Sequence, residues 1–420
     1  MQQQEHPHLP IKDILRAEEN IRNVVIKSPL MYMENISDEY HSKIYFKRED
    51  LQAVRSYKIR GAYNKISGLT RAEVSKGIIC ASAGNHAQGF AYTCNSLGIK
   101  GTVFMPNTTS KQKINQVNYF GKDWVTVELF GDTYDESYAA ALEYMDKHEL
   151  TFIHPFDDLE IIAGQATVAL EILSTATEPI DYLFLPIGGG GLAAGVSTVF
   201  KEYSPQTILI GVEPMGAASF ANSLKQQSNS TLQTIDKFID GAAVKRMGEI
   251  TFPICKRNID HAITIDEGQV CTSLLKVYNE NAIVVEPAGA LSIAALENYS
   301  TEIKNKNVVC ILSGGNNDIL RMEEIKERSL LFEEIKHYFI VNFSQRAGSL
   351  QEFLLNVLGT KDDITYFQYI KKTNRSNGSA VIGIELANKQ DFQPLMNRMK
   401  EQKFLELYLN DKPELFSYLV

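Results

Sequence analysis

The chain has 420 residues, of which 44% are hydrophobic and 22% are charged, values typical of a globular protein with two or three domains. Its net charge of -9 argues against a nucleic-acid-binding surface, which would be basic, and no run approaches the roughly 18 apolar residues of a membrane span. The five cysteines are scattered and the start, M-Q-Q-Q-E-H-P-H, lacks a signal-peptide pattern, so we expect a cytoplasmic protein with buried thiols and neither disulfides nor a metal site.

From residue 77 onward, apolar strands alternate with helical patterns. Nearly continuous apolar strands are buried on both faces, so this alternation predicts an α/β fold with a parallel sheet covered by helices on both sides. The expected strands are residues 77–83, 101–106, 124–130, 151–155, 181–187, 207–213 and 307–312, and the expected helices are 85–98, 110–121, 134–145, 159–176 and one after a glycine-rich turn.

The pattern changes near residue 318, where a charged helical segment extends to about residue 336. After it we predict the order βαββαβ, which is ferredoxin-like and forms a separate domain. The Asn-Gly pair in the turn N-R-S-N-G, residues 374–378, is a hairpin signal. The predicted elements are strand 337–343, helix 348–359, strands 364–371 and 379–386, helix 391–400 and strand 404–410.

The strongest local motif is P-I-G-G-G-G-L-A-A-G, residues 186–195, between an apolar strand and an apolar helix. Four consecutive glycines let backbone N–H groups approach a ligand, and the helix N-terminus adds positive potential, so the run predicts a phosphate site. The same run fits the dinucleotide pattern G-x-G-x-x-A from Gly188 to Ala193, with Glu213 about twenty residues on, where a ribose-binding acid would lie. An NAD-dependent oxidoreductase is therefore an alternative.

Three further turns carry polar residues beside glycine: S-A-G-N-H-A-Q-G at 82–89, V-E-P-A-G-A at 285–290 and S-G-G-N-N at 313–317. The carboxyl ends of parallel strands meet at one edge of a sheet, so we expect these turns to converge on one crevice. His86 and His154 could act there as acid–base groups, although a lone histidine is more often structural.

Lys58 lies in R-S-Y-K-I-R-G-A, after Ser56, which we expect to cap the following helix, and beside Tyr57 and Ile59. A lysine desolvated by such neighbours has a lowered pKa and can act as a nucleophile. Lys58, the glycine run and the hydroxyl of Ser313 are together the parts needed to hold pyridoxal phosphate.

These motifs, in this order over about the first 325 residues, resemble those of the fold-type II pyridoxal-phosphate enzymes, whose catalytic domain is a two-lobed parallel-sheet structure. K-R-E-D-L-Q, residues 47–52, resembles the serine/threonine dehydratase branch. The C-terminal domain resembles the ACT-like regulatory domain of the biosynthetic threonine dehydratases in their short form with one copy. R-A-G-S-L-Q-E-F-L, residues 346–354, matches its start, except that Ala347 stands where proline is usual.

The resemblance implies a threonine dehydratase that converts L-threonine, and secondarily L-serine, to a 2-oxo acid and ammonia on the way to isoleucine. It implies that Lys58 is the catalytic residue and the covalent anchor of pyridoxal phosphate, that isoleucine, and valine in addition, acts as effector, and that the chain forms a tetramer or dimer. The cofactor-binding residues it implies are Lys58, Asn85, Gly188, Gly189, Gly190, Gly191, Leu192 and Ser313, and the substrate-binding residues are Ser82, Ala83, Gly84, Asn85 and His86.

The expected division is a catalytic domain over residues 1–325, a linker helix over 326–336 and the ACT-like domain over 337–420. Ala83 stands where the racemase of this family has a serine that acts on the opposite face of Cα, so we expect lyase and not racemase activity. A serine/threonine dehydratase with a catabolic role and a non-enzymatic amino-acid-binding regulator are further alternatives.

Overall fold

The computed structural model describes residues 7–369, 377–412 and 414. The chain divides into two compact units, Met1–Ile319 and Leu320–Val420, which are described one at a time. The start of the chain, on which the signal-peptide prediction depends, and residues 374–376 of the predicted hairpin turn lie outside the described residues.

The first unit contains a six-stranded sheet in the order β1-β2-β10-β7-β8-β9. It is parallel except at its edge, where β1 pairs antiparallel with β2. Its strands are β1 (Leu30–Tyr32), β2 (Lys43–Arg48), β7 (Tyr182–Pro186), β8 (Ile208–Pro214), β9 (His261–Ile265) and β10 (Asn307–Leu312).

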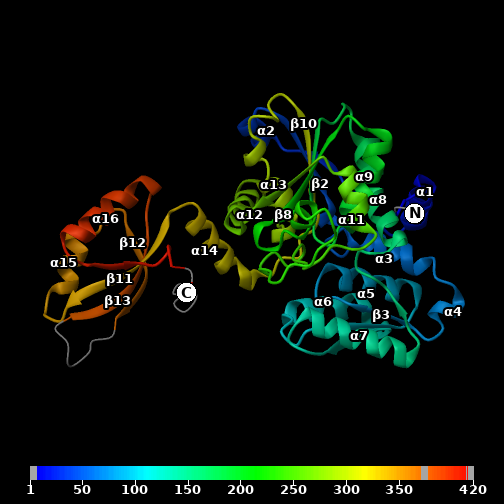
Figure 1. The fold of residues 1–420 in the computed structure, drawn as a ribbon, viewed down its shortest axis with the longest axis horizontal. Helices are drawn as coiled ribbons and strands as arrows, with labels where there is room; N and C mark the ends of the chain where they lie inside the picture. The colour runs from blue at the N-terminus through cyan, green and yellow to red at the C-terminus, as the bar shows by residue number, and fades with distance from the viewer. Residues whose placement is uncertain (1–6, 370–376, 413, 415–420) are drawn as a thin grey trace. The chain divides into compact units, whose positions relative to one another are not determined.

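A second, four-stranded parallel sheet has the order β5-β4-β3-β6. Figure 1 shows its strands and helices, in blue to cyan, grouped in one lobe, and β2, β8 and β10 in the other. The predicted alternation of strands and helices is thus confirmed, but it is divided between two sheets. The elements of this lobe are β3 (Ile78–Ala81), α5 (Asn85–Leu97), β4 (Gly101–Met105), α6 (Lys111–Gly121), β5 (Val125–Leu129), α7 (Tyr134–His148) and β6 (Thr151–Phe152).

Apolar side chains of α8 and α9 pack on β7 and β10 to form the main core of this unit. These two helices carry apolar residues on nearly every face, which is the pattern of a helix buried on all sides. All five cysteines are also buried. The remaining helices of the unit are α1 (Ile11–Ile21), α2 (Glu34–Tyr40), α3 (Lys58–Ser67), α4 (Arg71–Val74), α8 (Leu159–Thr175), α9 (Gly191–Tyr203), α10 (Ser219–Lys225), α11 (Thr251–Asn258), α12 (Glu267–Asn281) and α13 (Pro287–Ala294).

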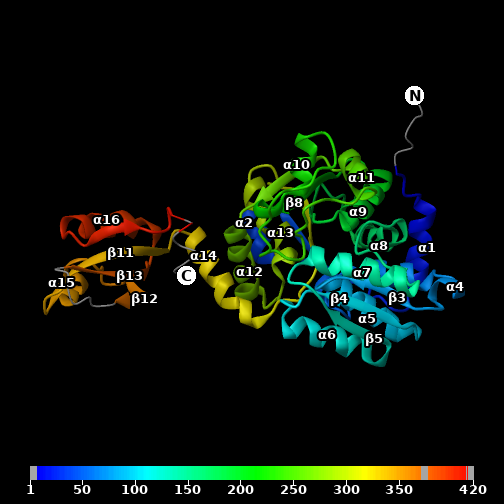
Figure 2. The ribbon, with the colours of Figure 1, turned by 60° about the horizontal axis from the view of Figure 1, so that its bottom comes forward.

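The second unit begins with α14 (Met322–Phe332) and then has the predicted order βαββαβ. Its antiparallel sheet has the order β12-β13-β11-β14, and Figure 2 shows α16 running along the sheet. Glu327 of α14 accepts a hydrogen bond from the hydroxyl of Tyr338 at 2.7 Å, which ties the helix to the first strand. The elements are β11 (Lys336–Ser344), α15 (Ser349–Asn356), β12 (Asp363–Tyr369), β13 (Asn377–Glu385), α16 (Phe392–Glu401) and β14 (Leu405–Tyr408).

A buried ion network holds α3 in the first unit. Arg60, which is fully buried in the first turn of α3, donates to both carboxylate oxygens of Glu49 at 2.8 Å and to those of Glu171 at 2.7 and 2.9 Å. Glu49 follows β2 and Glu171 lies on α8, so one guanidinium joins three segments of the chain. The fork of N–H donors on arginine suits two carboxylates at once.

Lys47 completes the network with a second buried cation, whose ammonium contacts Glu171 and the carbonyl of Ser28. Burial lowers the pKa of Lys47, although the two carboxylates oppose this change. Burial would also raise the pKa of Glu49, but Arg60 outweighs it and holds this pKa below its ordinary value. Two buried cations and two carboxylates therefore balance one another inside the protein.

We expect Arg60→Met to destabilise the first unit by about 3–5 kcal/mol, because two buried carboxylates would then share only Lys47. The free energy of unfolding can be measured by urea denaturation followed through Trp124, which is the only tryptophan of the chain and lies in this unit. Arg16→Met is the control, because the Arg16–Glu160 pair is exposed and such pairs contribute about 0–1 kcal/mol. If both variants lost the same small free energy of unfolding, the buried network would not be important for stability.

Candidate active site

Three of the predicted turns follow strands at the same ends of the sheets. The glycine run leads from β7 into α9, Ser313 follows β10, and residues 82–84 lead from β3 into α5. Since β7 and β10 are neighbours in one parallel sheet, the glycine run and Ser313 emerge at the same edge.

The chain just before α3 is bound to the turn after β10. The backbone N–H of Tyr57 donates to the carbonyl of Ser313 at 3.1 Å, and Ser56 forms an antiparallel bridge with Gly314. The expectation that Ser56 caps α3 is wrong, because the N-cap is Tyr57, no side chain caps this helix, and the buried hydroxyl of Ser56 has no partner among the described residues. The bridge to Gly314 keeps Ser56 from turning toward the helix.

Lys58 is the first residue of α3, and its ammonium donates to the carbonyl of Pro155 at 2.8 Å. Desolvation lowers the pKa of Lys58 to about 8, while the negative charge of Glu286 acts in the opposite direction. The neutral amine, which is the nucleophilic form, is therefore accessible near neutral pH.

Phe156, the residue after Pro155, packs against the glycine run. A Cβ added to Gly189 would lie 2.4 Å from the ring of Phe156, so this close approach requires glycine. Gly190, directly before α9, has a φ of 90°. Glycine adopts this left-handed conformation without strain. The carbonyl of Gly189 accepts from Thr251 at 2.6 Å, which turns the peptide groups of the run.

The backbone N–H groups of Gly188, Gly189, Gly190, Gly191 and Leu192 have no acceptor among the described residues. They stand at a helix N-terminus, where the first N–H groups always lack intrahelical partners and the helix dipole is positive. The run therefore has the donors and the potential to bind a phosphate.

Ser313 is buried, and the one hydrogen bond that its hydroxyl makes among the described residues is long, 3.4 Å to the carbonyl of Ala288. At this distance the hydrogen bond is weak, because hydroxyl donors ordinarily lie about 2.7–2.8 Å from their acceptors. The Ser313 hydroxyl can therefore turn to a ligand atom at the edge of the sheet.

Asn85, the first residue of α5, is bound on both sides of its amide. Its Nδ2 donates to Glu286 at 2.6 Å, and its Oδ1 accepts from Nδ2 of Asn316 at 2.6 Å. Asn316 belongs to the turn that begins at Ser313, so this contact joins α5 of one lobe to the turn after β10 of the other. The structure thus brings Lys58, Asn85 and Ser313 together.

The turn over residues 82–86 is partly exposed except at His86. The hydroxyl of Ser82 accepts from the N–H of Gly84 at 3.2 Å. The ring of His86 is buried, lies 3.1 Å from the carbonyl of Ile153, and has a pKa lowered to about 3 by burial and by Lys58. His86 is therefore a neutral ring, and this turn presents mainly backbone groups to a ligand.

Glu213 does not suit the ribose-binding role of the NAD-dependent alternative. Its side chain is fully buried and accepts the backbone N–H groups of Phe220 and Ala221, both at 2.7 Å. Burial raises its pKa to about 7. Both oxygens of Glu213 already accept backbone N–H groups from the start of α10, and neither lies at the surface, so this side chain is not placed to bind the ribose of a nucleotide.

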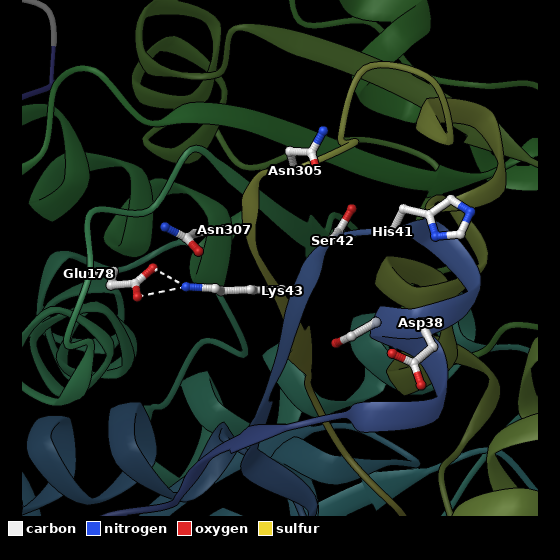
Figure 3. Close-up of a pocket in the computed structure, with 8 residues that line it drawn as sticks. Asp38, His41, Ser42, Lys43, Glu178, Asn305 and Asn307 are labelled. Carbon is white, nitrogen blue, oxygen red and sulfur yellow. Dashed lines mark hydrogen bonds and ion pairs between the residues drawn. The ribbon is translucent and has the colours of Figure 1, made fainter.

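A surface hollow of about 690 Å³ lies at the opposite, amino ends of β2 and β10 (Figure 3). Lys43 lies in it, but its ammonium is bound by both oxygens of Glu178 at 2.6 and 2.7 Å. The hollow contains none of the predicted site residues; it is lined by Ser37, Asp38, His41, Ser42, Lys43, Glu178, Asn305 and Asn307.

Sequence reasoning missed three contributors to the site: Asn316, the carbonyl of Pro155, and Arg60 with its carboxylates. The turn at residues 285–290 that contains Glu286 was expected to converge on the site, but no role was predicted for the Glu286 side chain. The first asparagine of S-G-G-N-N was a usable signal for Asn316, whereas the sequence gives no indication that a backbone carbonyl such as that of Pro155 contacts the site.

Comparison with known proteins identifies two families in the chain. Residues 21–314 match the family "Pyridoxal-phosphate dependent enzyme", and residues 327–419 match the "C-terminal regulatory domain of Threonine dehydratase". Within the described residues, no helix combines the length and the apolar character that crossing a bilayer requires.

Two curated relatives match almost end to end, and both are named L-threonine dehydratase biosynthetic IlvA. The Bacillus subtilis protein is 53% identical over 416 residues, covering 99% of both chains. The Halalkalibacterium halodurans protein is 52% identical over 412 residues, covering 98% of this chain and 99% of its own.

Solved structures show the same fold. Processed threonine deaminase isoform 2 from Solanum lycopersicum is 42% identical with a TM-score of 0.72, covering 76% of this chain and 92% of its own. Serine racemase from Dictyostelium discoideum is 32% identical with a TM-score of 0.68, covering 74% of this chain and 99% of its own. The chain therefore belongs to the fold-type II pyridoxal-phosphate-dependent enzymes, in the threonine dehydratase family that carries a C-terminal regulatory domain.

Proposed function

We propose that the chain converts L-threonine to 2-oxobutanoate and ammonia, the first step of isoleucine biosynthesis, with L-serine as a secondary substrate. The observation that carries this proposal is the position of Lys58 between the glycine run and Ser313. Its ammonium binds the carbonyl of Pro155, whose neighbour Phe156 packs on the glycine run, and the N–H of the preceding Tyr57 binds the carbonyl of Ser313. The near full-length similarity to two biosynthetic threonine dehydratases supports the substrate.

The residues present fit pyridoxal phosphate. The uncommitted N–H groups of Gly188–Leu192 suit its phosphate, the loosely bound hydroxyl of Ser313 suits its ring nitrogen, and the amide of Asn85 suits its ring oxygen. Lys58, with a pKa near 8, suits its aldehyde. These four assignments are proposals that rest on donor chemistry and on the family motifs.

Lys58 has two tasks in this proposal. Its amine would hold the cofactor through the aldehyde, and the same amine, when free, would take the proton from Cα of the substrate. Bound pyridoxal phosphate supplies the sink for the electrons of that bond. The backbone of residues 82–86 receives the substrate carboxylate. The β-hydroxyl would leave together with the proton taken from Cα, as one molecule of water, and a second water would hydrolyse the released enamine, through its imine form, to 2-oxobutanoate and ammonia.

Two neutral side chains favour elimination over other outcomes. Ser313 is a hydroxyl and not a carboxylate, so it does not hold a proton on the ring nitrogen, and a long-lived carbanion is less favoured. Ala83 has only a methyl group, which cannot return a proton from the opposite face of Cα. Lyase activity is therefore favoured over transamination and racemisation.

We propose that isoleucine, with valine as the second candidate, binds the C-terminal unit. A cavity of about 140 Å³ lies beside the start of α15; an apolar cavity of similar size binds benzene, so this one is large enough for a branched aliphatic side chain. Gly348 precedes the helix with a φ of 89°, and the N-terminus of α15 suits a carboxylate. The lining residues are Phe343, Ser344, Arg346, Gly348, Ser349, Leu350, Phe367 and Tyr369.

Three finer points are proposals that rest on the same resemblance. The catalytic domain spans residues 1–325, the linker 326–336 and the regulatory domain 337–420; the family matches over residues 21–314 and 327–419 support a division of the chain into these two domains, though not the boundaries of the linker. The assembly is a tetramer or dimer, and the protein works in the cytoplasm.

Lys58→Ala should abolish threonine turnover, because the anchor and the base are removed together. The purified variant should also lack the yellow absorption that borohydride bleaches in the unaltered protein. Lys65→Ala is the matched control, because Lys65 lies on the same helix but pairs with Asp158. Normal turnover by Lys58→Ala, measured as 2-oxobutanoate formation, would refute the assignment.

The rate at which the cofactor-free protein captures pyridoxal phosphate should rise with pH and level off above about pH 8. Only the neutral amine reacts, and burial has lowered the pKa of Lys58 to about 8, below the ordinary value for a lysine. Stopped-flow absorbance between pH 6.5 and 10.5 would show this. A rate that still climbs at pH 10 would mean that Lys58 behaves as an exposed lysine.

Leu350→Ala should weaken isoleucine inhibition about tenfold, because the loss of buried apolar contact corresponds to roughly 1–2 kcal/mol. Turnover without isoleucine should stay unchanged. Leu355→Ala is the control, because Leu355 lies on the same helix, is 72% exposed and does not line the cavity. Inhibition curves that coincide for both variants would place the effector elsewhere.

A further inference from the structure

A chain of hydrogen bonds runs through the amide of Asn85. Nδ2 of Asn316 donates both to the carbonyl of Val54 at 2.8 Å and to Oδ1 of Asn85 at 2.6 Å. Nδ2 of Asn85 in turn donates to Oε1 of Glu286 at 2.6 Å. The order is therefore a carbonyl, two amides and a carboxylate.

Both ends of this chain accept hydrogen bonds and cannot donate them. A backbone carbonyl has no proton, so the atom of Asn316 that faces Val54 must be its nitrogen. A carboxylate has none when ionised, so the atom of Asn85 that faces Glu286 must also be nitrogen. The orientation of two amides, which is ambiguous for an isolated side chain, is thus determined from both ends.

The two anchors are themselves well held. Glu286 is 5% exposed and its backbone N–H donates to the carbonyl of Gly314 at 3.2 Å, while Asn316 is 7% exposed. Asn316 belongs to the turn that begins at Ser313, and the N–H of Glu286 is bound to Gly314 of the same turn. The hydrogen bond between Asn85 and Glu286 is partly buried and charge-assisted, and such a bond is stronger than a neutral one.

We propose that Glu286 and Asn316 are positioning residues that fix the amide of Asn85, so that the second N–H of its Nδ2, and not its carbonyl oxygen, is left for a ligand. This inference rests on the proposed function, in which Asn85 meets the ring oxygen of pyridoxal phosphate. Asn85 then binds that oxygen as a donor, which suits an oxygen that carries negative charge. Neither Glu286 nor Asn316 needs to touch the cofactor.

The test is the affinity of cofactor-free protein for pyridoxal phosphate, measured by absorbance titration in a double-mutant cycle. Asn85→Ala should weaken binding about tenfold, the loss of roughly one net hydrogen bond. Asn316→Ala and Glu286→Gln should each weaken it about threefold to tenfold. In the Asn85→Ala background neither should weaken it further by more than about twofold, because both act through Asn85.

Titration at pH 9 keeps Lys58 neutral in every variant, so the charge of Glu286 does not act through that lysine. Glu297→Gln is the control, because Glu297 loses the same charge but pairs with Tyr40 at an exposed site; it should bind like the unaltered protein. Losses that add fully in the Asn85→Ala background would show a general structural effect and overturn the inference, and so would unchanged binding in Asn316→Ala and Glu286→Gln.

Failure of the proposed function looks different. An unaltered protein that neither binds pyridoxal phosphate nor turns over L-threonine would overturn that function and the positioning inference with it. If the unaltered protein binds pyridoxal phosphate and turns over L-threonine, but Asn316→Ala and Glu286→Gln bind the cofactor equally well, only the positioning inference is overturned.

Discussion

The catalytic unit depends on the balance of four charges buried around Arg60. Removing an ion from water costs several kcal/mol, so a guanidinium, an ammonium and two carboxylates are tolerated inside only when each satisfies the others. Arg60 contacts Glu49 and Glu171 with four hydrogen bonds, and Lys47 reaches the second of them. Because Arg60 lies two residues after Lys58 in the same helical turn, this balance also fixes the position of the backbone that carries Lys58.

The network gives a physical reason for the sequence K-R-E-D ahead of the lysine. Lys47 and Glu49 point into the buried cluster, whereas Arg48 and Asp50 pair with each other at 2.7–2.8 Å. Two residues of the motif, Lys47 and Glu49, therefore help to hold α3 through the buried ion pairs with Arg60 and Glu171.

The turn after β10 has a comparable role for the other side of the crevice. Its residues 313–316 bind the segment before α3, the N-terminus of α5 and the start of α13. Short backbone contacts of this kind leave little freedom to the side chains between them. A rigid arrangement is needed because a group displaced by about 1 Å can lose two orders of magnitude in rate.

Much of this could be predicted from the sequence. Apolar strands ending in glycine marked β3, β7 and β10, and four consecutive glycines marked a cradle, because local composition decides such turns. The pattern of strands and helices did not divide them between two sheets; only the family resemblance implied two lobes. The partnership of Arg60 with Glu171 and the contact of Lys58 with Pro155 could not be predicted, because each joins residues about a hundred positions apart. Ser56 failed as a cap because its backbone pairs with Gly314, a tertiary contact that overrides local preference.

The burial of all five cysteines has a practical consequence for experiments. Desolvation raises the pKa of the Cys80, Cys94, Cys255 and Cys310 thiols, so little reactive thiolate forms at neutral pH. A cysteine introduced at an exposed position would therefore stand out chemically, and maleimide dyes would attach there without prior removal of the native thiols. Pairs of such labels, one in each unit, would turn the distance between the catalytic and regulatory parts into a fluorescence signal.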